Sequence, residues 1–129
     1  TTPAFSEIRP IEDGYLMLTE KAVTDDFAQD LSAEEQKMVF ATQGATQGAI
    51  LGTPLKKAAW HDKPSWFVVA SNDRTIAPEQ EAFTAKRMNA TVLTLPSSHV
   101  PMLSHPEPVA NFIADAAASI GAGKAAAAQ

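Results

Sequence analysis

The sequence contains no cysteine. Disulfide frameworks, zinc sites built on thiolates and a cysteine nucleophile are therefore excluded. No apolar run approaches the roughly 18 residues of a membrane span, so we expect no membrane partner and a soluble, cytoplasmic chain. Cations are also few, with 10 Lys and Arg against 15 Asp and Glu and a net charge of -5. Because no cluster of cations is present to bind phosphates, we expect no nucleic-acid partner.

Histidine is scarce as well. The three histidines are His61, His99 and His105, and none stands in the H-x-x-x-H spacing of a zinc site, so we expect no metal and no cofactor. His61 lies beside Asp62 and is expected to be solvated. His105 immediately precedes a proline and is expected to mark a helix entry.

The 129 residues are 45% apolar and 19% charged, the composition of an ordinary globular domain. Three zones differ in character. Residues 1–63 are polar and predict a hairpin followed by helices. Residues 64–120 alternate strand and helix signals. Residues 121–129 form a Gly- and Ala-rich stretch, too short to nucleate a stable helix alone, and predict a flexible tail.

In the first zone, Asp13-Gly14 separates two apolar-containing runs and predicts a hairpin. Pro10 would confine the first strand to an edge. Ser32 and Glu35 match a capping box, which predicts a helix running to about Gln43, where Gly44 follows. The zone has an apolar face of little volume, made by Phe27, Leu31, Met38, Val39 and Phe40.

In the second zone, the apolar run 66–70 is typical of a strand buried on both faces. Pro78 precedes a helix over 79–88, with Asn89 as its C-cap. A strand is predicted over 91–95. Pro106 then begins a helix with one apolar stripe, made by Val109, Phe112, Ile113, Ala116, Ala117 and Ile120. Strand, helix, strand and helix in this order predict an α/β fold with a parallel sheet.

Polar residues follow both predicted strands. Asp73 comes shortly after the first and His99 shortly after the second. Ligands of open parallel sheets lie beyond the carboxyl ends of the strands, and neighbouring strands lie about 4.8 Å apart. An acid and an imidazole placed there can hydrogen-bond, which fixes the tautomer and leaves Nε2 for a nucleophile. The alternatives are a simple turn residue for Asp73 and a structural loop residue for His99.

This arrangement resembles the C-terminal half of an α/β-hydrolase. The resemblance rests on the strand 66–70, on Asn72-Asp73-x-x-Ile76-x-Pro78, on Ser98-His99-Val100-Pro101-Met102 and on the last amphipathic helix. It implies that Asp73 is the catalytic acid, that His99 is the general base and that residues 1–63 are a cap. The segment 25–31, Asp-Asp-Phe-Ala-x-Asp-Leu, looks like small bacterial esterases of this superfamily.

The family also uses a serine in G-x-S-x-G, which precedes the acid and the histidine in the chain. That motif is absent from these residues. We therefore expect a fragment, or one of two chains, that is inert by itself and needs the N-terminal half of the same hydrolase as its partner, because an Asp–His pair activates nothing without a nucleophile.

The resemblance leaves several reactions open, because one fold serves many. Hydroxynitrile lyases on the same scaffold place a lysine immediately after the catalytic histidine, whereas this chain has Val100 there. An apolar residue suits an ester pocket, with Val100 as a substrate contact. We expect a serine hydrolase of the carboxylesterase type that acts on a small, uncharged ester, with a lyase or another hydrolase as the alternative.

Two other classes remain open. Thr1 would be the nucleophile if the chain were an N-terminal-threonine hydrolase, in which the α-amine acts as the base. The chain would be a non-catalytic interaction module if it folded as a monomer with a complete core.

Overall fold

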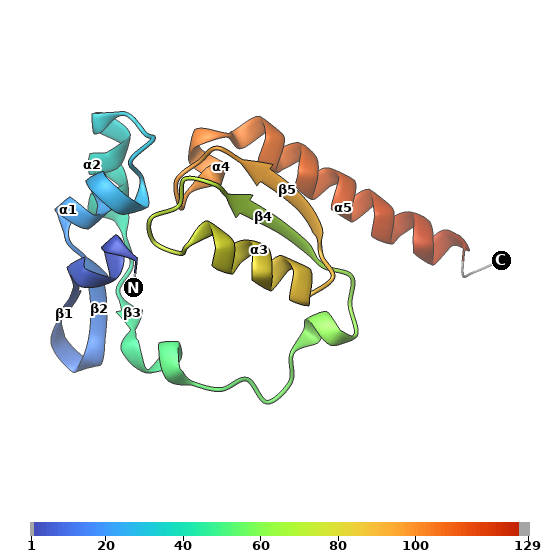
Figure 1. The fold of residues 1–129 in the computed structure, drawn as a ribbon, viewed down its shortest axis with the longest axis horizontal. Helices are drawn as coiled ribbons and strands as arrows, with labels where there is room; N and C mark the ends of the chain where they lie inside the picture. Colours follow the sequence, from blue (N-terminus) through green and yellow to red (C-terminus); the bar gives the residue numbers. More distant parts are fainter. Residues whose placement is uncertain (1, 127–129) are drawn as a thin grey trace.

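The computed structural model describes residues 2–126, so Thr1 lies outside the described residues. Two regions follow one another along the chain (Figure 1). The N-terminal region carries a three-stranded antiparallel sheet in the order β1–β2–β3, and the C-terminal region carries a parallel sheet of β4 and β5. Between them the chain forms two short 3-10 helices, η4 (Gly48–Gly52) and η5 (Ala59–His61).

The predicted hairpin is present. After a 3-10 helix, η1 (Pro3–Glu7), the strands β1 (Ile8–Pro10) and β2 (Tyr15–Leu18) pair around the turn η2 (Glu12–Gly14). Asp13 and Gly14 both have positive φ, 56° and 76°, a conformation that Asp and Gly accept in hairpin turns. β1 lies at the edge of the sheet, where Pro10 removes no ladder hydrogen bond.

The predicted capping box begins helix α2 (Ala33–Thr42). The Ser32 hydroxyl accepts from the N–H of Glu35, and the Glu35 carboxylate accepts from the N–H of Ser32. The helix ends at Thr42, one residue earlier than predicted, with Gln43 as its C-cap. Strand β3 (Thr46–Gln47) then pairs with β2. We did not predict it, because two polar residues carry no strand signal.

A small buried cluster joins the two regions. Between β2 and α2 the chain forms α1 (Glu20–Ala22) and a π-helical turn, η3 (Val23–Phe27). Val23 and Ala28 pack there against Val100 of the C-terminal region. The cluster is flanked by Leu18, Phe27, Leu31, Val39 and Phe40. The prediction that Met38 shares this face is wrong, because its side chain is 63% exposed.

The C-terminal region has the predicted α/β order. Strands β4 (Trp66–Ala70) and β5 (Thr91–Leu95) have the predicted bounds and pair in parallel, with Ala70 opposite Leu95. Helix α3 (Pro78–Arg87) connects them, with Pro78 at its first position. In Figure 1 the two strands are drawn between α3 and the long last helix, α5.

Helix α3 ends one residue earlier than predicted. Its C-cap is Met88, and Asn89 follows with a positive φ of 49°. The N–H groups of Asn89 and Ala90 donate to carbonyls of the last turn of the helix. Asparagine accepts this left-handed conformation, which closes helices in the Schellman pattern. Asn89 therefore ends the helix, but from the position after the cap.

The parallel sheet is less covered than the apolar run 66–70 predicts. Only Val69 and Ala70 of β4 are buried, and residues 66–68 are half-buried. In β5 the side chain of Val92 is 47% exposed. The prediction of a strand buried on both faces is wrong for residues 66–68, because two strands and the described helices do not enclose them.

The last part of the chain is helical. A short helix that we did not predict, α4 (Pro101–Ser104), precedes α5 (Pro106–Ala126). Of the predicted apolar stripe of α5, Val109 is buried whereas Ile113 is 62% exposed. Helix α5 continues into the predicted flexible tail, and residues 127–129 lie outside the described residues. Among the described helices, none combines the length and apolar character needed to cross a membrane.

Candidate active site

The turn after β4 fixes the position of Asp73. We call residues 71–77 the acid turn. The Asp73 N–H donates to the carbonyl of Ala70, and Oδ1 of Asp73 accepts from the N–H groups of Thr75 (2.6 Å) and Ile76 (3.0 Å). These are the local bonds of an Asx-turn. They use one carboxylate oxygen, so the other remains for a partner outside the turn.

The loop after β5, residues 96–100, carries His99, and we call it the histidine loop. It stays bonded to the acid turn beyond the ends of the strands. The N–H of Ser71 donates to the carbonyl of Leu95 (2.8 Å), and the N–H of Asn72 donates to the carbonyl of Ser97 (3.1 Å). The parallel register therefore continues into both loops and brings their side chains together.

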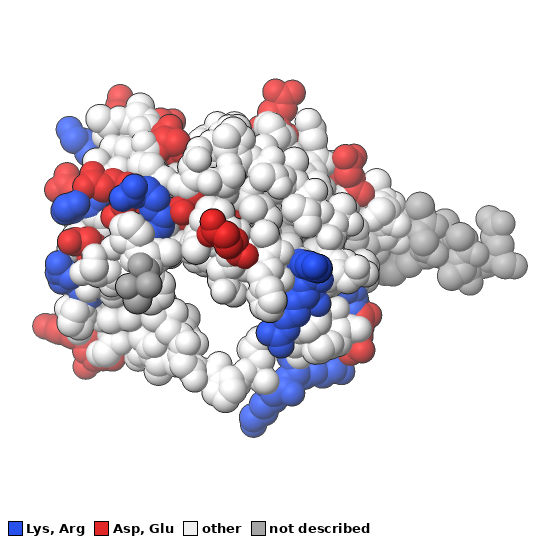
Figure 2. Space-filling model, viewed as in Figure 1, with Lys and Arg blue, Asp and Glu red and all other residues white. Residues whose placement is uncertain are grey.

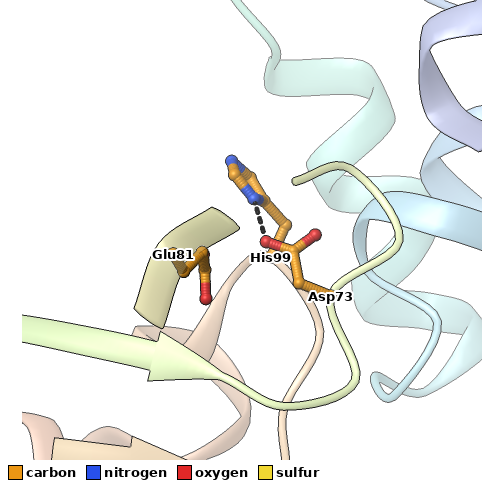
Figure 3. Close-up of side chains that lie close together, drawn as sticks. All are labelled: Asp73, Glu81 and His99. Atoms are coloured by element: carbon orange, nitrogen blue, oxygen red, sulfur yellow. Dashed lines mark hydrogen bonds and ion pairs between the residues drawn. The ribbon is translucent and has the colours of Figure 1, made fainter. Parts of the chain in front are cut away.

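Asp73 and His99 meet directly. Nδ1 of His99 lies 2.7 Å from Oδ2 of Asp73 (Figure 3). The Asp73 side chain is fully buried, and the His99 side chain is 29% exposed. An ionised carboxylate only accepts hydrogen bonds, so Nδ1 carries the proton and Nε2 of the neutral ring is the basic atom. The pair thus holds a base of fixed tautomer at an accessible position.

The surroundings of Asp73 favour its ionised form. Burial alone would raise the pKa of the Asp73 carboxyl. The hydrogen bonds from His99 and from the N–H groups of Ile76 and Thr75 outweigh burial, and the pKa lies below its ordinary value. The carboxylate therefore stays charged at neutral pH and remains an acceptor for the imidazole.

Glu81 is a third member of the site that the sequence analysis missed. It lies on α3, is 8% exposed, and its carboxylate accepts from the N–H of Ala70 (2.7 Å). Figure 3 shows its side chain beside Asp73 and His99. Burial, and then the neighbouring Asp73 carboxylate, raise the pKa of Glu81 despite the bond from Ala70. Glu81 lies four residues before the buried Ala85, and residues at this spacing share one face of a helix. This spacing was the sequence signal that Glu81 faces the sheet rather than solvent.

Asp73, Glu81 and His99 each offer an atom within 4.8 Å of the others, a spacing that a metal ion could bridge. Several of their acceptor atoms are already used, although Nε2 of His99 and Oε1 of Glu81 have no hydrogen-bond partner among the described residues. Both oxygens of Asp73 accept hydrogen bonds, and Glu81 accepts from the Ala70 N–H. A cation would have to displace buried hydrogen bonds, which costs free energy. The geometry therefore suits proton transfer better than metal binding.

An apolar pocket of about 500 Å³ lies in the N-terminal region. Phe27 and Leu103 line it, together with Ile8, Leu16, Met17, Leu18, Val23, Val39, Thr42, Gln43, Gly44, Thr46 and Leu51. The ring of Phe27 also lies against the ring of His99, with 4.9 Å between their centroids. Phe27 thus contacts both the pocket and His99, whereas neither Asp73 nor His99 lines the pocket, and no charged side chain lines it.

Val100, His61 and His105 take no part in the hydrogen bond between Asp73 and His99. Val100 is 7% exposed and packs with Val23 and Ala28, so its role as a substrate contact stays a prediction. His61 is exposed and stacks on the ring of Trp60. His105 lies between α4 and α5 and bonds Ser104, at the helix entry that we predicted.

Comparison with known proteins agrees with this fold. The crystal structure of polyneuridine aldehyde esterase matches 85% of this chain and 47% of its own, with a TM-score of 0.69 and 14% identity. A histidine-to-alanine mutant of that esterase matches 84% and 46%, with a TM-score of 0.68 and 14% identity. The chain thus spans about half the length of these structures. At this identity the likeness shows the fold alone.

None of the curated proteins compared with the chain is similar enough to match. A family model described as "Alpha/beta hydrolase family" matches residues 2–112, which include both loops and the first turns of α5. The parallel β4–β5 sheet with its flanking helices confirms the predicted fold class. The chain belongs to the alpha/beta hydrolase family.

Proposed function

We propose that this chain supplies the acid and the base of a Ser-His-Asp triad in a carboxylic ester hydrolase. Asp73 is the acid, His99 is the base, and the serine lies on a segment outside these 129 residues. The observation that carries the proposal is the 2.7 Å bond from a half-buried imidazole to a fully buried carboxylate, at the carboxyl ends of two parallel strands.

The proposed chemistry follows from this bond. Nε2 of His99 takes the proton of the serine hydroxyl as the serine oxygen attacks the ester carbonyl. The imidazolium, stabilised by Asp73, then gives that proton to the leaving alcohol, and an acyl-enzyme remains. Water attacks the acyl-enzyme with His99 again as the base, which releases the acid and restores the serine.

Four features support completion by another segment, the N-terminal half of the same hydrolase. The chain matches about half the length of its structural relatives. In the described residues each parallel strand pairs on one side only, and large apolar side chains are exposed on α3, β5 and α5 (Phe83, Val92, Ile113). Figure 2 shows an opening between the two regions and the segment that connects them. Parallel sheets are normally covered on both faces, so we expect the other segment to occupy this opening.

The apolar pocket supports a small, uncharged ester as the substrate. Its lining carries no charged side chain, so a charged acyl or alcohol group would lose hydration without gaining a partner. Val100 stands where the related lyases place a lysine. Among the described residues, no lysine or arginine forms a hydrogen bond or an ion pair with His99. Both observations favour ester hydrolysis over cyanohydrin cleavage. A cytoplasmic location stays a prediction.

Turnover of p-nitrophenyl acetate by the protein expressed from its whole coding sequence tests the proposal. His99→Ala should lower kcat/KM by at least about 10³-fold, because the serine loses its base. His61→Ala is the matched control, since that exposed histidine lies outside the site, and it should leave turnover unchanged. Wild-type turnover that survives in His99→Ala at unchanged thermal stability would refute the assigned role.

A further inference from the structure

The segment Asp26–Asp30 contacts both loops of the candidate site, although neither its sequence motif nor the triad chemistry explains why. It lies 43 to 72 residues before its partners in the chain. It begins in the π-helical turn η3, and such turns occur frequently at functional sites. We call it the positioning segment.

Asp30 holds the histidine loop. Its Oδ2 accepts from the N–H of Ser98 at 2.8 Å, and Ser98, which directly precedes His99, is fully buried. Partial burial would raise the pKa of Asp30, but hydrogen bonds from the Ser98 hydroxyl and N–H and from the Ser104 hydroxyl lower it below its ordinary value. The charged carboxylate therefore binds the backbone of the residue directly before His99.

Asp26 holds the acid turn. The Asp26 carboxylate is 2.6 Å from Nε of Arg74, and its residue is only 3% exposed. The Asp26 carbonyl also accepts from the Thr75 hydroxyl (3.1 Å). Thr75 is the residue whose N–H donates to Asp73. Both partners of Asp26 thus directly follow the proposed catalytic acid in the chain.

Gln29 makes a directional contact with the residue before Asp73. Its amide Nε2 donates to the carbonyl of Asn72 (2.7 Å), the residue before Asp73. Its Oε1 is buried without a hydrogen-bond partner among the described residues. An unsatisfied buried oxygen costs about 1–3 kcal/mol, so an apolar side chain would hold the two regions together more cheaply. Gln29 instead fixes the place of one backbone carbonyl.

Phe27 completes the contact, because its ring lies against the imidazole that Asp73 binds. Residues 72, 74, 75, 98 and 99 are therefore all contacted by four of the five residues 26–30 of the N-terminal region. Hydrogen bonds fix direction as well as distance, whereas apolar packing alone would permit the loops to shift.

We infer that Asp26–Asp30 is a positioning segment that sets the geometry of the Asp73–His99 pair, with Asp30 as the positioning residue for His99. The inference rests on the proposed function only where it predicts an effect of the positioning segment on ester turnover. The hydrogen bond between Asp73 and His99 can be observed whether or not the protein hydrolyses esters.

The test compares three variants of the protein expressed from its whole coding sequence. Asp30→Ala removes the acceptor of Ser98, Asp30→Asn keeps an oxygen acceptor, and Asp25→Asn is the matched control, because Asp25 is exposed and pairs only with Lys21 among the described residues. The readouts are kcat and KM for p-nitrophenyl acetate, the melting temperature, and the NMR resonance of the proton on His99 Nδ1. That proton resists exchange with water only while it is hydrogen-bonded.

Asp30→Ala should lower kcat about 10- to 100-fold, a loss of the size found when a hydrogen-bond partner that orients a metal ligand is removed. KM should change little, and the Nδ1 proton resonance should broaden or vanish. Asp30→Asn should restore most of kcat and the resonance, and Asp25→Asn should match the wild type. A lower melting temperature with kcat and the resonance unchanged would overturn the inference, because the segment would then be merely structural.

Gln29→Leu decides the question if Asp30→Ala does not fold. Leucine removes the amide that holds Asn72 and also removes the unsatisfied oxygen. We expect a melting temperature at or above that of the wild type together with a kcat lowered about threefold or more, in line with lost hydrogen-bond positioning. An unchanged kcat would overturn the inference. If the wild type hydrolyses no ester, the proposed function fails, and the His99 Nδ1 resonance in the same variants still tests the positioning segment.

Discussion

The two regions of the molecule divide the work of the candidate site unequally. The C-terminal region supplies both reacting side chains, Asp73 and His99, from loops at the ends of a parallel sheet. The N-terminal region supplies no member of that pair, yet its segment Asp26–Asp30 binds the backbone or side chains around both. The comparison teaches that the chemistry lies in one region and its alignment depends on the other, so the two should respond differently to substitution.

The largest effect should come from the C-terminal region. Asp73→Asn should lower kcat/KM for p-nitrophenyl acetate about 10³- to 10⁴-fold, because an amide no longer fixes the tautomer of His99 or stabilises its cation. Asparagine can still accept from Thr75 and Ile76, so the melting temperature should change far less. Asp62→Asn, at an exposed position, is the control. A loss below about tenfold would mean that Asp73 is a turn residue only.

A smaller effect, on stability, should come from the buried cluster of the N-terminal region. Val23 is 1% exposed in the cluster that joins the regions. Val23→Ala should lower the free energy of unfolding by about 2 kcal/mol, through lost burial and the cavity left behind. Met38→Ala removes an exposed side chain of the same region and should change the free energy of unfolding by less than about 0.5 kcal/mol. If denaturant unfolding showed equal losses of unfolding free energy for Val23→Ala and Met38→Ala, the buried cluster would not be what holds the two regions together.

The smallest effect should be the pH dependence of stability at Glu81, a carboxyl of the C-terminal region whose pKa is raised. A folded-state pKa above the ordinary value of 4.5 means that the stability from this group is complete below that value and falls as pH rises through the folded pKa. Asp73, with a lowered pKa, behaves oppositely and loses its contribution as pH falls.

Glu81→Gln keeps an acceptor for the Ala70 N–H but cannot ionise. It should match the wild type in unfolding free energy near about pH 4 and exceed it near about pH 8. Glu79→Gln changes another glutamate in the first turn of α3 and serves as the control. If wild type were the more stable protein at the higher pH, Glu81 would be stabilised in its charged form, contrary to the direction of its pKa shift.

The elements of the C-terminal region could be predicted from the sequence because their signals are local. The apolar runs 66–70 and 91–95 are bounded by turn residues, and both strands have the predicted bounds. The proximity of Asp73 and His99 followed from the rule that parallel strands end at one edge of the sheet. Their roles as acid and base stay predictions until turnover is measured.

The N-terminal region was less predictable, because its part in the site consists of contacts between distant residues. The bonds of Asp26 to Arg74 and of Asp30 to Ser98 join positions 48 and 68 residues apart, and no local pattern encodes such pairs. Glu81 was missed for a different reason. A carboxyl on a charged helix looks like a solvated residue unless its spacing from Ala85 is considered.

Labelling with a fluorophosphonate, which reacts covalently with an activated serine, tests most directly whether His99 serves a nucleophile outside this chain. In the protein expressed from its whole coding sequence, the label should attach to one serine outside residues 1–129, and His99→Ala should remain unlabelled over the same time. Mass spectrometry of the digested protein locates the label. Attachment to a serine within residues 1–129, or labelling of His99→Ala at the wild-type rate, would contradict the proposed triad.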